Sequence, residues 1–67
     1  MSSLAEELPK EQSRVREVLG HYKEIGAAGV FGAAMIDQSL ARADNAIMSG
    51  DVIAMLSALA DLKEIES

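Results

Sequence analysis

Cysteine and tryptophan are absent from this 67-residue chain, and Tyr22 and Phe31 are its only aromatic residues. Without cysteine, neither a disulfide nor a thiolate zinc site is available to stabilise so short a domain. The apolar residues make up 49% of the chain and are mainly Ala, Leu, Ile, Val and Met, a mixture that favours helices over strands. We therefore expect a single all-α domain over residues 1–67.

The chain also lacks a long hydrophobic run. Its longest uncharged stretch, residues 25–36, has twelve residues, whereas a helix needs about 20 apolar residues to span a bilayer. The first residues show no positively charged start followed by an apolar run, so no signal peptide is predicted. These features predict a cytoplasmic protein, and they do not favour a membrane as its partner.

Basic residues are few: six Lys and Arg stand against eleven Asp and Glu, which gives a net charge of −5. An acidic chain repels nucleic acid and anionic membranes. The residues Ala46, Gly50 and Leu56 match the spacing of a helix-turn-helix motif. The reading helix would then be residues 52–61, which offer no Arg, Lys, Asn or Gln to a base edge or a phosphate. We therefore expect no nucleic-acid partner.

Apolar residues recur at spacings of three, four and seven, which predicts three helices, at about residues 9–25, 28–49 and 52–65. The predicted core stripes are Leu8, Val15, Val18, Leu19, Tyr22 and Ile25 in the first helix, Gly29, Gly32 or Ala33, Ile36, Leu40, Ala43 and Ile47 in the second, and Val52, Met55, Leu56, Leu59 and Leu62 in the third.

Residues that start or stop helices stand at the predicted boundaries. Pro9 suits a first helical turn, where its missing N–H costs nothing. Gly26 and Gly50 occupy the position where helices commonly end, and Asp51 is suited to cap the next helix. So short a connection makes the second and third helices antiparallel neighbours. The expected fold is thus three antiparallel helices.

The uncharged stretch 25–36 carries glycines at a period of three, at Gly26, Gly29 and Gly32. It lacks the spacing and the Lys-Ser/Thr ending of a phosphate loop. Small residues four apart, Ala28 with Gly32 and Gly29 with Ala33, instead let two helix backbones approach closely. The run therefore predicts close helix packing and no cofactor.

Val30, Phe31 and Met35 point away from the main stripe of the second helix and, with Ile53, are surplus apolar residues. Exposed apolar patches mark association sites, and a 67-residue chain buries only about 60% of its unfolded surface. Coverage of these residues by the first helix is the alternative. We predict a homo-oligomeric bundle, such as a homodimer, whose interface comprises Gly29, Val30, Phe31, Gly32, Ala33, Met35, Ile36 and Ile53.

No constellation of residues predicts catalysis. His21 is the only histidine, and it lies four residues after Glu17 on the polar flank of the first helix. A lone histidine without H-x-x-x-H or H-E-x-x-H spacing does not predict a zinc site. The four internal serines, Ser13, Ser39, Ser49 and Ser57, stand in no nucleophile motif. We therefore predict no catalytic residue, no metal and no enzyme.

Three segments carry a resemblance to known sequences: Leu8-Pro-Lys-Glu-Gln12, Tyr22-Lys-Glu-Ile-Gly26 and Gly29-Val-Phe-Gly-Ala-Ala-Met-Ile36. The chain resembles a group of short, uncharacterised helical proteins from bacteria and prophages, and this resemblance implies no activity.

The surplus apolar residues predict a small protein that self-associates and acts by protein–protein interaction, in an accessory or regulatory role. Whether it also binds a different protein is left open. A membrane-active helix centred on residues 27–36 is the alternative.

Overall fold

The computed structural model describes residues 3–66 as almost entirely helical. The helices are α1 (Leu4–Glu24), the short 3-10 helix η1 (Gly26–Gly29), α2 (Val30–Ser49) and α3 (Val52–Lys63). Those residues contain no strand, so the prediction of an all-α chain is confirmed.

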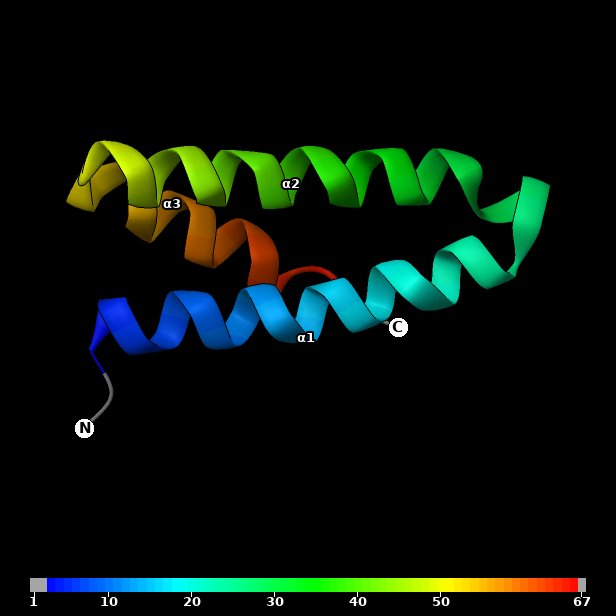
Figure 1. The fold of residues 1–67 in the computed structure, drawn as a ribbon, viewed down its shortest axis with the longest axis horizontal. Coiled ribbons are helices and arrows are strands. Elements are labelled where there is room, and N and C mark those ends of the chain that lie inside the picture. Colours follow the sequence, from blue (N-terminus) through cyan, green and yellow to red (C-terminus); the bar gives the residue numbers. More distant parts are fainter. Residues whose placement is uncertain (1–2, 67) are drawn as a thin grey trace.

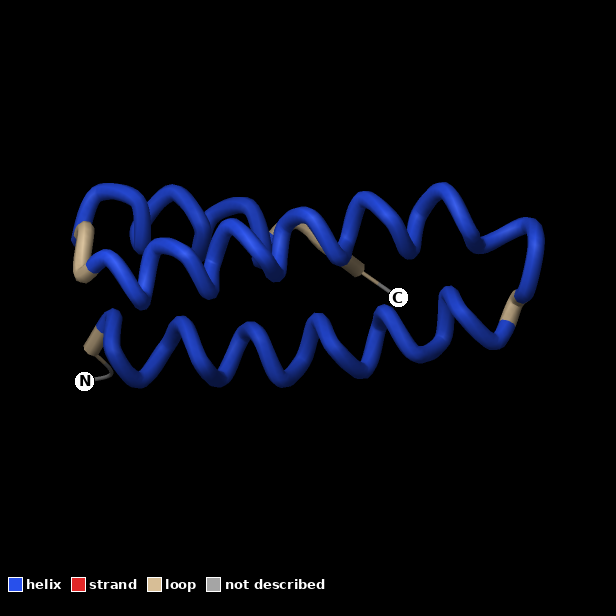
Figure 2. Tube along the Cα trace, turned by 45° about the horizontal axis from the view of Figure 1, so that its top comes forward, coloured by secondary structure: helices blue, strands red, loops and turns tan. Residues whose placement is uncertain are grey.

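The three α-helices pack side by side, and each contacts the other two. The chain turns at η1 so that α2 runs back alongside α1, and α3 then lies against both (Figure 1). With only 12 residues against the 20 of α2, α3 reaches along one part of α2 (Figure 2). The half of α2 that begins at Val30 therefore has α1 as its helical neighbour and lies beyond the end of α3.

Helix α1 begins at Leu4, five residues before the predicted start at Pro9. The Ser3 side chain caps it by accepting a hydrogen bond from the Glu6 amide at 3.3 Å. Fully buried Leu8 adds a core contact that only the longer helix supplies. Pro9 consequently lies in the second turn, where it removes one hydrogen bond to the exposed Ala5 carbonyl.

The predicted helix stops are confirmed at both turns. Gly26 has φ 81° and Gly50 has φ 67°, left-handed values that favour glycine. Asp51 caps α3 by accepting a hydrogen bond from the Ala54 amide at 3.2 Å. Three further boundaries differ from prediction: α1 ends at Glu24, α2 starts two residues late because η1 occupies the residues before Val30, and α3 ends at Lys63.

The core lies where the three helices meet. Leu8 and Val15 from α1 and Leu62 from α3 are its fully buried large side chains. The remaining buried apolar residues are Val18, Leu19, Ala33, Ile36, Leu40, Ala43, Ala46 and Ala58. Four residues predicted as core are exposed instead: Ile25, Ile47, Val52 and Leu56. In α3 the reason is that Ala58 and Leu62 are turned toward the neighbouring helices.

Polar contacts at the edge of the core fix how α1 sits on the other two helices. Buried Gln12 donates a hydrogen bond from Nε2 to Asp44 Oδ1 of α2 at 2.7 Å, and Arg16 lies 3.5 Å from the same oxygen. Arg14 donates from Nη2 to the carbonyl of Leu62 at 2.9 Å, near the end of α3. These contacts tie α1 to α2 through Asp44 and to α3 through the Leu62 carbonyl, and they give buried Gln12 a hydrogen-bond partner.

Candidate interaction surface

The glycine run makes its close contacts with α1 of the same chain. A Cβ added at Gly29 would collide with the backbone carbonyl oxygen of Tyr22. A Cβ added at Gly32 would lie 2.5 and 2.6 Å from two atoms of the Tyr22 ring. The predicted close approach of two backbones is therefore present at Gly29, where the partner is the end of α1, whereas Gly32 makes room for the Tyr22 ring.

The eight residues predicted as an oligomer interface separate into two groups. Gly29, Ala33 and Ile36 are buried and Gly32 is half-buried, all within the chain. The other four, Val30, Phe31, Met35 and Ile53, are large apolar residues that stand exposed, with Phe31 at 78%. Within the predicted interface, Gly29, Gly32, Ala33 and Ile36 therefore pack inside the chain, and its four remaining residues face solvent.

A groove of about 680 Å³ lies between α2 and α3. The small side chains of Ala46, Ala54 and Ala58 line it, because alanine leaves the space between two helices unfilled. Its polar lining residues are Arg42, Asn45, Ser49, Ser57 and Asp61. The apolar stripes of the sequence do not indicate this groove, because its shape depends on how α2 and α3 are rotated against each other. The alanines on both helices are the sequence signal that could have indicated it.

Arg42 and Asp61 join the two walls of this groove. Arg42 Nη2 lies 2.8 Å from Asp61 Oδ2 and donates a second hydrogen bond to Ser39 Oγ at 3.0 Å. More than half of the Arg42 side chain is exposed. The ion pair by itself therefore contributes only about 0–1 kcal/mol to stability. The two contacts hold the guanidinium between Ser39 of α2 and Asp61 of α3, at the edge of the groove.

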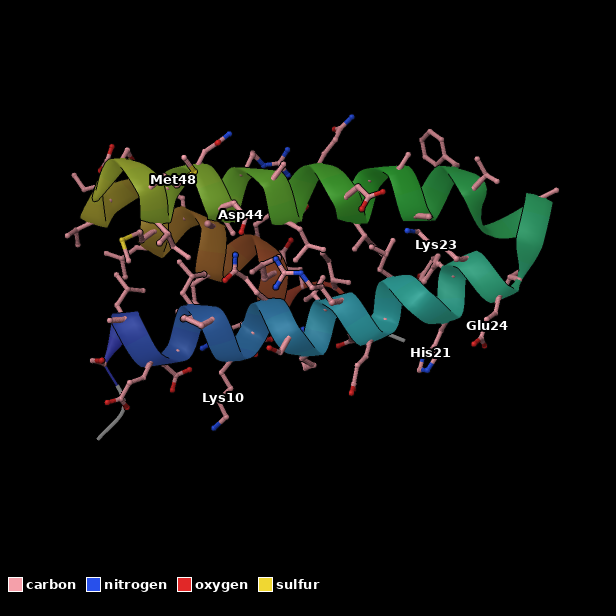
Figure 3. The ribbon with its side chains drawn as sticks, in the orientation of Figure 1. Lys10, His21, Lys23, Glu24, Asp44 and Met48 are labelled. Carbon is pink, nitrogen blue, oxygen red and sulfur yellow. The ribbon has the colours of Figure 1, made fainter. Side chains whose placement is uncertain are left out.

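The ionisable side chains are spread over the surface rather than gathered. His21, Lys10 and Glu24 point outward from α1, whereas Asp44 lies on the side of α2 that faces α1 (Figure 3). Within residues 3–66 no three His, Asp or Glu side chains are placed to share a metal ion. The two features that distinguish the surface are thus the exposed apolar residues Val30, Phe31, Met35 and Ile53 and the groove between α2 and α3.

Comparison of the chain with protein-family models, with curated proteins and with solved structures found no match. The resemblance to short bacterial and prophage-borne helical proteins therefore stays a prediction. Across the described helices, none combines the length and the apolar character needed to cross a membrane.

Proposed function

We propose that the protein self-associates and acts through protein–protein contact, as a cytoplasmic accessory or regulatory protein without catalytic activity. In this proposal three antiparallel helices form each protomer of a homo-oligomeric bundle. The observation that carries it is the exposure of Val30, Phe31, Met35 and Ile53. Transfer of each such side chain out of water is worth about 2 kcal/mol.

The total surface of the chain supports the same conclusion. Its accessible surface is 4517 Å², whereas a compact monomer of 7.1 kDa has about 4,100 Å². The excess of roughly 400 Å² is half of the ~800 Å² that a standard interface takes from each partner. Burial of about 400 Å² of this surface against a second copy would bring the domain to the surface expected for its mass.

A membrane-active segment at residues 27–36 is the second candidate, and exposed Val30 and Phe31 favour it. Insertion of the whole segment, however, would have to separate Gly29, Ala33 and Ile36 from α1. Nucleic acid is the least favoured partner, because the net charge is −5 and backbone phosphates attract basic surfaces.

Light scattering at micromolar concentration tests the proposal. We expect a mass of at least twice 7.1 kDa for the wild-type chain. Phe31→Gln and Met35→Gln should lower that mass toward the monomer, because each replaces an apolar contact with an amide. Met48→Gln is the matched control: Met48 is 83% exposed and lies on the Val30 side of α2, about 100° around the helix from Phe31.

Two results separate the candidates. A wild-type chain that stays monomeric across the micromolar range contradicts self-association. Co-flotation of that monomer with liposomes would assign Val30 and Phe31 to a lipid surface instead.

A further inference from the structure

One face of α2 carries both the projecting apolar residues and a wall of the groove. Phe31 and Ser49 are 18 residues apart, which is about five full turns and about 27 Å along the helix. Met35 and Arg42 lie between them on the same face, at steps of four and seven residues. Phe31 and Met35 are exposed near one end of this face, and Ser49 lines the groove at the other.

We propose that two copies of the chain pair through this face, with their α2 helices antiparallel about a two-fold axis beside Gln38, and that Phe31 of each copy occupies the groove of the other. This inference rests on the proposed self-association and specifies its geometry. Phe31 lies seven residues before Gln38, and Ala46 of the groove lies eight residues after it. A two-fold axis at Gln38 therefore brings Phe31 of each copy to the groove of the other copy, so that the two contacts are equivalent, as an isologous interface requires.

The groove fits an aromatic side chain in size and chemistry. Its volume of about 680 Å³ lies within the ~300–1,000 Å³ typical of sites that enclose a ligand. The alanines Ala46, Ala54 and Ala58 offer apolar contacts without side chains long enough to block entry. Because α3 lies along one part of α2 only (Figure 2), it does not cover the Phe31 end of this face.

The charges on this face favour the same pairing. Met35 and Glu64 line a second, smaller hollow of about 190 Å³. The two-fold axis places Arg42 of one copy within about one residue of the level of Met35 of the other, and so near the second copy's Glu64. Each Arg42, which already pairs with Asp61 in its own chain, would thus gain a second carboxylate, while the axis itself carries the neutral Gln38. Opposite charges that meet across an interface fix its register.

A tryptophan reporter tests this geometry directly, because the chain contains no tryptophan. In the Phe31→Trp variant we expect the fluorescence emission to move to shorter wavelength as protein concentration rises through the association range. Gln38→Cys should form a disulfide-linked dimer under mild oxidation, since the two copies of this position adjoin the axis. Lys10→Cys, on the outer side of α1 (Figure 3), is the control and should not.

Filling the groove supplies an independent variant. Ala54→Leu places a branched side chain where Phe31 should enter and is expected to weaken association by about tenfold or more. Ala60→Leu adds the same side chain to an exposed position of α3 outside the groove and should associate like the wild type.

The outcomes distinguish this inference from the proposed function. If the chain associates but the emission is independent of concentration and Ala54→Leu associates like the wild type, the two-fold pairing is wrong and self-association stands. If the wild type is monomeric at every concentration, both are wrong. A shift of emission that requires lipid vesicles and not concentration also overturns the pairing, by assigning Phe31 to a membrane surface.

Discussion

Gly29→Ala is expected to remove about 3 kcal/mol of stability, most of the ~3–5 kcal/mol that the core of so small a domain supplies. The added Cβ would overlap the carbonyl oxygen of Tyr22 and lie 3.3 Å from the Cβ of Ile25. The Tyr22 carbonyl belongs to the backbone of α1, so it cannot move aside as a side chain does. Relief requires the start of α2 to shift away from α1, which opens the core at Ala33.

Gly20→Ala is the matched control for this substitution. A Cβ at Gly20 meets nothing within 4 Å, and the residue lies on the exposed side of α1. Alanine there should raise stability by up to ~1 kcal/mol through helix propensity. Thermal unfolding followed by circular dichroism separates the two, since 1 kcal/mol corresponds to about 4–8 °C in a domain of this size. A Gly29→Ala variant that melts at or above the wild type would show that α1 and α2 do not approach closely at Tyr22.

Leu62→Ala is expected to cost about 2–5 kcal/mol, the range for leucine truncation in a packed core. Leu62 is 0% exposed and is the only large side chain of α3 among the fully buried ones. Its loss leaves α3 joined to the core mainly by Ala58 and by partly buried Met55 and Leu59. The hydrogen bond from Arg14 to the Leu62 carbonyl is unchanged by the substitution, so the expected loss reports side-chain packing.

Leu56→Ala on the same helix controls for the change in composition. Leu56 is 54% exposed, and a surface substitution of this kind changes stability by no more than about 0.5 kcal/mol. Urea unfolding of both variants provides the comparison. Equal losses of stability from Leu62→Ala and Leu56→Ala would mean that α3 does not turn Leu62 into the core and Leu56 toward solvent.

Local signals in the sequence were sufficient to predict the number of helices and their turns. Gly26 and Gly50 end helices because the backbone there needs a positive φ, and Asp51 caps through its own side chain. The start of α1 was harder, because Pro9 is a strong local signal for a first turn. It is outweighed by the Ser3 cap and by the burial of Leu8, which depends on α2 and α3.

The interface residues show where sequence reasoning reaches its limit. The period-three glycines predicted a close helix approach but not its partner, since Tyr22 lies in another helix. Arg42 contacts Asp61 of α3, a pairing that the sequence of α2 alone does not indicate. The groove escaped prediction for a related reason: Ala46 and Ala58 adjoin one another only after α2 and α3 pack. Contacts between helices depend on their relative rotation, which a single-helix pattern does not contain.

Thermal unfolding measured over a hundredfold range of protein concentration tests the central claim, that a second copy covers the exposed apolar face of α2. Dimerisation stabilises the folded chain by mass action, so we expect the wild-type Tm to rise by about 5 °C or more from the lowest concentration to the highest. The Phe31→Gln variant should lose most of this dependence, and Met48→Gln should retain it. A wild-type Tm that is constant over the whole range would contradict the account, because a monomer unfolds independently of its concentration.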